Sequence, residues 1–179
     1  MNNKIEVFHV VTERPMYLNQ IIKFDENSTT GVYKRVMEKE SIVKDIYNNK
    51  EKYENVELEH HVKVALRELA MEDLRKEKYP NYPSRIKSLY VSRTLEEANF
   101  WADYFIKLDR KVYQIVKLEV DGNIFEGDAN NCFPGTIDYN KNLELAKDYW
   151  ENKVNDKKRI NEVLVDGTIK VIEIIKEYN

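Results

Sequence analysis

Glycine and cysteine are scarce in this 179-residue sequence. The five glycines are scattered, so they form neither a GxGxxG fingerprint nor a Walker-type loop, both of which bring backbone close to phosphate. This absence disfavours the Rossmann and P-loop classes of nucleotide-binding fold. The single cysteine, Cys132, cannot form an intramolecular disulfide, which fits a protein of the reducing cytoplasm.

Metal ligands and long apolar runs are also missing. The histidines are His9 and the adjacent pair His60 and His61, and none has a cysteine or histidine at zinc-site spacing, so we expect no metal. No run approaches the roughly 18 apolar residues of a membrane span. Glutamate and histidine interrupt the short apolar stretch near the N-terminus, which therefore lacks a signal-peptide core. We expect a soluble cytoplasmic protein without a membrane partner.

The charge balance is slightly acidic, with 29 Lys and Arg against 32 Asp and Glu and a formal net charge of −3. Binding to nucleic acid requires a basic stripe that neutralises phosphates, and this balance does not readily supply one. The composition therefore argues against a nucleic-acid partner, while a local basic patch stays open.

The hydrophobic pattern predicts a single α+β domain over residues 1–179. In the first strand His9 shares a face with Ile5 and Val7. Alternating β-branched and aromatic residues predict strands at 4–12, 88–92, 111–120, 124–126, 162–165 and 168–175. Apolar residues three and four apart predict helices within 33–78, after a capping box at 94–97, and over 143–154. Turn-rich segments are expected at 25–31, 79–83 and 128–138, and the Asp-Gly pairs at 121–122 and 166–167 occupy hairpin positions.

Four segments in a fixed order carry a resemblance to a known family. They are the strand bearing His9, then LYVSRTLEEANFW, then VYQIVKLEVDGNIFEGD, and last NEVLVDGTIKVIEIIKEY. Together they resemble the His-Tyr-Glu branch of the ADP-ribosyltransferase superfamily, including the catalytic domains of poly(ADP-ribose) polymerases. Those domains close with a strand pair that begins Asn-Glu-Tyr-Ile-Val, and the segment that starts at Asn161 is similar.

The resemblance implies a role for each matching residue. Glu162 falls at the catalytic glutamate, which stabilises the oxocarbenium-like state formed when the glycosidic bond of NAD breaks. We expect His9 to donate a hydrogen bond to a ribose hydroxyl, and Tyr90 and Trp101, eleven positions apart, to stack on the nicotinamide ring.

The rifampin ADP-ribosyltransferases are a second family that this chain resembles. Their Phe-Glu-Asp-Asp-Pro-Asn and Phe-Pro-Gly-Asn motifs are similar to residues 125–130 and 133–136, which makes Asp128 a second acidic candidate. Arg14 or Arg93 is a candidate for holding the pyrophosphate. One departure concerns Val10, because the superfamily has glycine after its first-strand histidine, where backbone pairs with the nicotinamide amide.

The resemblance implies a split β-sandwich with surrounding helices and a helical insertion near residues 33–78. It implies NAD as a substrate and transfer of ADP-ribose to an unknown acceptor, either a protein or a small molecule. Two alternatives stay open. One is a non-catalytic binding or interaction module on the same fold, and the other is an α+β protein of unknown function in which the short matches are coincidental.

Overall fold

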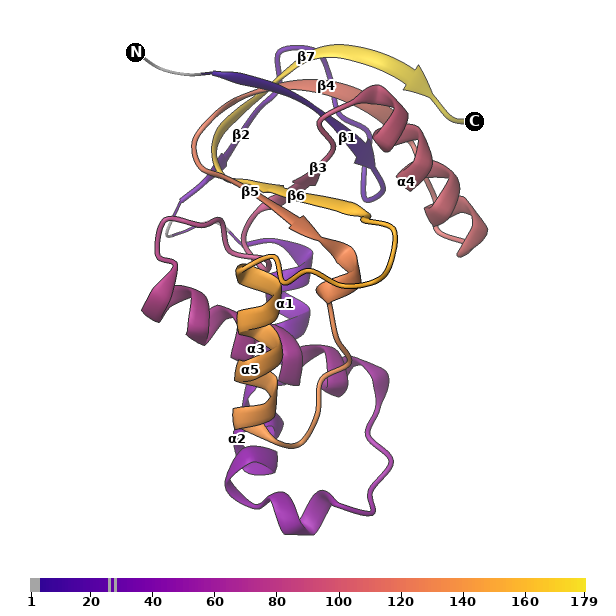
Figure 1. Ribbon diagram of the computed structural model, residues 1–179. Helices are drawn as coiled ribbons and strands as arrows, with labels where there is room; N and C mark the ends of the chain where they lie inside the picture. The colour runs from indigo at the N-terminus through magenta and orange to yellow at the C-terminus, as the bar shows by residue number, and fades with distance from the viewer. Residues whose placement is uncertain (1–3, 26, 28) are drawn as a thin grey trace. The chain divides into compact units, whose positions relative to one another are not determined.

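The computed structural model describes residues 4–25, 27 and 29–179, and it contains both helices and strands, 39% and 25% respectively. The strands are β1 (Ile5–Val11), β2 (Ile21–Phe24), β3 (Leu89–Val91), β4 (Gln114–Asp121), β5 (Ile124–Asp128), β6 (Asn161–Val165) and β7 (Gly167–Glu177) (Figure 1). The α-helices are α1 (Gly31–Met37), α2 (Glu40–Asn48), α3 (His60–Lys78), α4 (Leu95–Lys107) and α5 (Tyr139–Trp150). Two short 3₁₀ helices are η1 (Lys50–Tyr53) and η2 (Ala129–Asn131). The fold class is α+β, as the sequence predicts.

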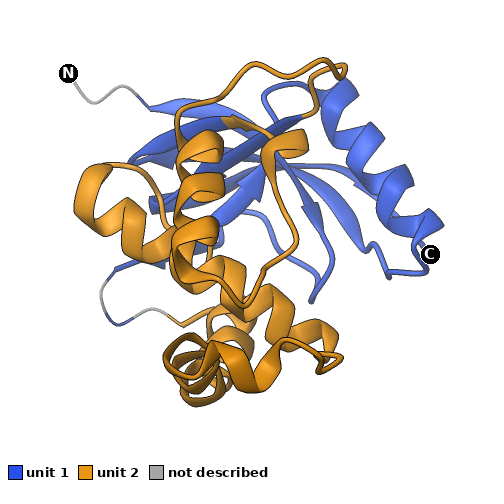
Figure 2. Cartoon of the chain, turned by 60° about the horizontal axis from the view of Figure 1, so that its bottom comes forward, with its two compact units in different colours: residues 1–28, 88–126, 161–179 blue, residues 29–87, 127–160 orange. Residues whose placement is uncertain are grey.

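The chain divides into two compact units, coloured separately in Figure 2. Unit 1 comprises residues 1–28, 88–126 and 161–179, and unit 2 comprises residues 29–87 and 127–160. Nearly all of the strand residues belong to unit 1, whereas four of the five α-helices belong to unit 2.

Unit 1 is built from two sheets that share one apolar core. The four-stranded sheet has the order β1-β4-β7-β2 and the three-stranded sheet the order β3-β6-β5. Aliphatic residues of both sheets form one buried cluster: Val7, Val11, Val91, Val116, Leu118, Val120, Val163, Val165, Ile169 and Val171. Since side chains alternate between the two faces of a strand, each sheet contributes one apolar face to this core.

The two Asp-Gly pairs do not form hairpins, and this part of the sequence prediction is wrong. Strands β4 and β7 belong to the large sheet, whereas the neighbours in sequence, β5 and β6, belong to the small one. At each pair the chain therefore crosses from one sheet to the other. The crossings lie side by side, because the Asn123 amide donates to Asp166 Oδ1 at 2.8 Å and the Asp166 amide to the Asn123 carbonyl at 3.2 Å.

Close backbone contact explains why glycine occupies both crossings. A Cβ atom on Gly122 would lie 2.2 Å from the Asp166 carbonyl oxygen, and one on Gly167 would lie 2.4 Å from that of Asp121. Gly167 also has a φ of +80°, which other L-residues rarely adopt. The pattern that indicates a hairpin thus serves a sheet-to-sheet crossing instead.

Helix α4 covers the other face of the large sheet. Val10 and Ile115 pack there against Ala98 and Ala102, both fully buried. Thr94 caps the helix by accepting the Glu97 amide at 3.2 Å, as the capping box predicts. The reciprocal bond differs from the prediction, because Glu97 Oε2 accepts the amide of Arg93 at 3.1 Å.

Unit 2 is helical and has its own core. Helices α1, α2 and α3 bury Val36, Val43, Ile46, Val62, Ala65, Leu66 and Ile86 in one cluster. Helix α3 ends at Lys78, two residues before Pro80, as the sequence predicts. Helix α5 begins four residues earlier than expected, because Asp138 caps it by accepting the Lys141 amide.

Two further differences from the sequence prediction concern short segments. The four-residue strand β2 is missing from the prediction, and the segment 128–138, expected to be a loop, contains η2. Of the expected turn at 25–31, residues 26 and 28 lie outside the described residues.

Candidate functional site

His9 lies on β1 and points toward the small sheet, as its shared face with Val7 predicts. Its Nδ1 atom lies 2.7 Å from the backbone carbonyl oxygen of Tyr90, on β3. A second contact lies beside it, because Phe8 on β1 and Ser92, which directly follows β3, exchange backbone hydrogen bonds of 2.8 and 2.7 Å. The edge of the large sheet is thereby joined to the edge of the small one at His9.

The surroundings of His9 determine which hydrogen bonds it can make. Burial lowers its pKa to about 4, although the Tyr90 carbonyl acts in the opposite direction, so the ring is neutral at pH 7. A carbonyl oxygen only accepts, so Nδ1 carries the proton and donates to Tyr90. Nε2 is then an acceptor. In this state His9 can accept a hydrogen bond from a ligand hydroxyl, and it has no second N–H to donate, contrary to the role expected from the sequence.

The side chain of Val10 and its backbone N–H and C=O groups point in different directions. The side chain is buried beneath α4 with Ala98 and Ala102, on the opposite face of β1 from His9. The backbone N–H and C=O of Phe8 point away from β4 toward Ser92, and backbone direction repeats every second residue in an antiparallel strand. The N–H and C=O of Val10 therefore point to the same outer edge of β1.

Tyr90 and Glu162 lie on one face of the small sheet. Tyr90 pairs with Leu164 across the antiparallel ladder of β3 and β6, and paired residues share a face. Glu162 is two residues from Leu164 and so shares that face, opposite to the core residues Val91 and Val163. Continuing the register places Glu162 across from Ser92, the residue that bridges to β1.

A hydrogen-bond network from α4 holds the start of β6, directly before Glu162. The indole N–H of Trp101 donates to the Asn161 carbonyl at 3.2 Å, and the Asn161 side-chain amide donates to Glu97 Oε1 at 2.6 Å. The same Glu97 accepts the amide of Arg93. Trp101 thus contacts the neighbour of Glu162 through its polar edge, while its ring packs near Phe105.

The sequence does not reveal Asn161 and Glu97 as part of this network. Glu97 is recognisable only as a capping residue, and Asn161 only as the residue before Glu162. The contact between them spans 64 residues, so no local pattern signals it.

The two arginine candidates differ in their surroundings. Arg14 is exposed and follows β1 by three residues. Arg93 is also exposed, but its Nε lies 3.2 Å from Glu126 Oε1 on β5. A pyrophosphate held by Arg93 would therefore have to compete with this carboxylate.

Asp128 belongs to unit 2, whereas the other candidates belong to unit 1. It is buried, and its carboxylate accepts from the backbone and side chain of Asn130, the side chain of Asn155 and the Ile160 amide. Burial acts to raise the pKa of Asp128, but these hydrogen bonds outweigh it and hold the pKa below its ordinary value. With its oxygen atoms occupied in this way, Asp128 serves to hold the loop of residues 151–160.

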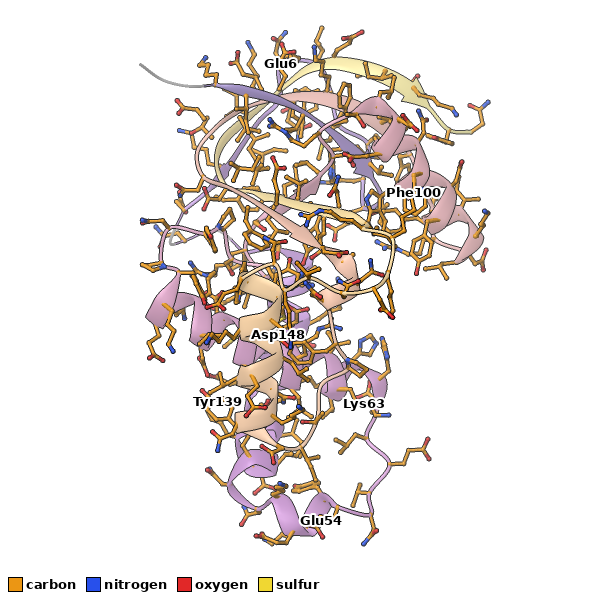
Figure 3. All side chains as sticks on the ribbon, in the orientation of Figure 1. Glu6, Glu54, Lys63, Phe100, Tyr139 and Asp148 are labelled. Atoms are coloured by element: carbon orange, nitrogen blue, oxygen red, sulfur yellow. The ribbon has the colours of Figure 1, made fainter. Side chains whose placement is uncertain are left out.

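An open hollow of about 310 Å³ lies within unit 2, lined by Lys44, Tyr47, Asn48, Asp73 and Tyr139. Tyr139, labelled in Figure 3, donates to Asp73 Oδ2 at 3.0 Å. None of the residues that the sequence proposes for the site lines this hollow.

The described part of the chain contains neither a cluster of metal ligands nor a helix suited to cross a membrane. No cluster of three or more His, Cys, Asp or Glu side chains suited to a metal ion occurs among residues 4–25, 27 and 29–179. Within the same residues, no helix combines the length and the apolar character that crossing a bilayer requires.

Comparison with known proteins identifies a family whose function is unknown. No curated protein matches the chain. The family model described as a protein of unknown function, DUF2441, matches residues 7–177, which include most of β1 and all of β6 and β7. The chain therefore belongs to the DUF2441 family.

Proposed function

We propose that unit 1 binds NAD and transfers its ADP-ribose group to an acceptor. The observation that carries this proposal is the hydrogen bond between His9 and the Tyr90 carbonyl. It brings the first-strand histidine to the strand of the tyrosine, and β6 with Glu162 is the neighbour of that strand. The three residue types of the His-Tyr-Glu branch thus come from three adjoining strands of one unit, with His9 on the face of β1 that carries Val7, and with Tyr90 and Glu162 on the face of the small sheet opposite Val91 and Val163.

The reaction would use these residues as follows. The bond between C1′ of the ribose and the nicotinamide nitrogen breaks, and its electron pair leaves with nicotinamide. Glu162 would hold a ribose hydroxyl and stabilise the positive charge that develops on the ring. His9 Nε2 would accept from a ribose hydroxyl. The acceptor nucleophile then forms a bond to C1′ and loses its proton to solvent.

The backbone of Val10 supports the same proposal. In the superfamily the backbone at this position, where glycine stands, pairs with the nicotinamide amide. The resemblance therefore extends to Val10 only if the valine side chain does not block this pairing. In this protein the Val10 side chain is buried under α4, while its N–H and C=O point to the outer edge of β1. Valine therefore leaves the donor and the acceptor in position.

The test is release of nicotinamide from NAD by the full chain, with water as the acceptor. We expect slow release by the natural protein and a loss of at least about 100-fold in Glu162→Gln, which keeps the shape and removes the charge. Glu173→Gln, an exposed change on β7, is the matched control and should retain full activity.

Calorimetric titration with NAD separates the alternatives. Binding of NAD without any release of nicotinamide would favour the non-catalytic module on the same fold. Equal release by the natural protein and Glu162→Gln would overturn the role of Glu162, and absence of NAD binding would overturn the proposal as a whole.

A further inference from the structure

The outer face of α4 exposes aromatic side chains. Phe100, labelled midway along the helix in Figure 3, is 51% exposed, and Tyr104, one turn later, is 45% exposed. Their rings are nearly parallel, with 11° between the planes and 6.5 Å between the centroids. Exposed aromatic groups of this kind commonly mark an interaction surface.

The exposed face can be defined from the helix period of 100° per residue. Ala98 and Ala102 are fully buried and mark the side of α4 that packs on the large sheet. The opposite side carries five exposed residues, which we call the α4 face: Glu96, Phe100, Asp103, Tyr104 and Lys107. The α4 face is thus aromatic at its centre and charged at its ends.

The charges at the two ends have opposite signs. Glu96 lies in the first turn and Lys107 in the last, and neither has an ion-pair partner within the described part of the chain. In an antiparallel pair of identical helices, a residue near the start of one helix faces a residue near the end of the other. The sequence numbers of facing residues therefore add up to a nearly constant value. The pairs Glu96–Lys107 and Phe100–Tyr104 have sums of 203 and 204, so one alignment satisfies both.

We propose that the chain forms a homodimer through antiparallel packing of the α4 face on a second copy. The two-fold axis crosses the α4 face between Phe100 and Tyr104, at the level of residue 102 along the helix. Phe100 of each copy packs on Tyr104 of the other, and Glu96 of each copy meets Lys107 of the other, which makes the interface self-complementary. The negative Glu96 at the start of α4 and the positive Lys107 at its end suit a second copy of the same chain. In an antiparallel pair, the start of each helix faces the end of the other, so opposite charges meet.

The size of the α4 face sets the strength expected for this dimer. A helix of 13 residues is about 20 Å long, so one pair of such faces is small for a permanent assembly. Asp103 is one residue from the position of the two-fold axis. The Asp103 carboxylates of the two copies would therefore lie near each other at the edge of the interface. We therefore expect a reversible dimer whose population rises with protein concentration.

Sedimentation velocity over a range of concentrations measures the dimer in the full chain. We expect Phe100→Glu to raise the dimer dissociation constant at least tenfold, because it places two charges in the aromatic centre. Glu96→Lys and Lys107→Glu should each weaken the dimer about tenfold, since each turns two attractive pairs into repulsive ones. Circular dichroism would show whether each exposed substitution leaves the fold intact.

The double variant Glu96→Lys with Lys107→Glu is the decisive measurement. It restores both attractive pairs with the signs exchanged, so dimerisation should return to within about threefold of the natural protein. Glu173→Lys, the same change at an exposed position of β7, should have no effect. A natural protein that stays monomeric at all concentrations, or a double variant no better than the single ones, would overturn the proposal. This test is independent of NAD.

Discussion

The Nδ1 atom of His9 and the carbonyl oxygen of Tyr90 lie 2.7 Å apart, although 81 residues separate them in the chain. The bond holds His9 in the tautomer that leaves Nε2 free of a proton. Burial keeps the ring neutral by lowering its pKa to about 4. The stability of this part of unit 1 therefore depends on an uncharged histidine, and so does the proposed role of His9 in binding NAD.

The half-buried His9 should make stability depend on pH between about 6.5 and 4. In this window the unfolded chain binds a proton that the folded protein does not, so stability falls as the pH falls, and the effect levels off below about 4. The loss amounts to at most about 3 kcal/mol. Urea unfolding across this range should show a weaker dependence for His9→Gln than for the natural protein. The exposed variant His60→Gln should behave as the natural protein does, and equal slopes for all three would contradict the prediction.

Replacement of Asp128 by asparagine should destabilise the protein by at least about 2 kcal/mol. Asparagine would direct an NH₂ group toward donors that now bond to a carboxylate oxygen, which leaves buried donors unpaired. Denaturant unfolding measures the change. Asp156→Asn is the control, because Asp156 is exposed in the same loop and should shift stability by less than about 0.5 kcal/mol. Similar losses in the two variants would refute the special role of Asp128.

A methyl group at Gly122 should disrupt the crossings between the two sheets. The added Cβ would approach the Asp166 carbonyl oxygen to 2.2 Å, and the backbone of the second crossing would have to move. We expect Gly122→Ala to lower stability by about 2 kcal/mol or more. The contrasting variant is Gly31→Ala at the start of α1, which should be neutral or stabilising. Thermal unfolding followed by circular dichroism would compare them.

The buried pair of Glu68 and Arg85 should tolerate joint replacement better than single replacement. Arg85 Nε donates to Glu68 Oε2 at 3.0 Å, and both side chains are nearly inaccessible to solvent. Burial acts to raise the pKa of Glu68, but Arg85 and Arg67 outweigh it and hold the pKa below its ordinary value.

Arg85→Met alone leaves the buried Glu68 carboxylate paired with Arg67 but no longer with Arg85. We expect this change to lower the free energy of unfolding by about 3 kcal/mol or more. The double variant Glu68→Leu with Arg85→Met should recover part of that loss in urea unfolding. A double variant as unstable as the sum of the single ones would show that the pair itself supplies the stability.

The proposed dimer should strengthen when the charge of Asp103 is removed. Two Asp103 side chains would approach one another near the two-fold axis, so Asp103→Asn should lower the dimer dissociation constant by several-fold at low salt. The difference should shrink in 0.5 M salt, because exposed charges are then screened. Sedimentation velocity at both salt concentrations measures it. A weaker dimer in Asp103→Asn would exclude the antiparallel alignment.

The local structure follows closely from local residue patterns. Alternation around His9 predicts β1 and its buried face, the Thr94 cap marks the start of α4, and Pro80 marks the end of α3. These features depend on neighbours within one or two turns, which is the range that a sequence pattern covers. The prediction fails at β2, where four residues give too short a pattern, and at α5, where the Asp138 cap is not recognised.

The candidate site could be predicted from the sequence less completely than the strands and helices that carry it. His9, Tyr90 and Glu162 are recognisable as residues of interest from their motifs, and all three lie in unit 1. Asp128 is also recognisable, but its hydrogen bonds assign it to holding a loop in unit 2. Motifs indicate residue types, whereas roles depend on partners that are distant in the chain.

The α+β class and the faces of the strands follow from short-range periodicity in the sequence, and the candidate site residues follow from its motifs. The tertiary structure alone decided that the Asp-Gly pairs are crossings between sheets and that His9 donates to Tyr90. It also decided that Asn161 is held by Trp101 and Glu97. The physical reason is that strand pairing and these hydrogen bonds join residues 60 or more positions apart, and their geometry exists only once both sheets have packed around the shared core.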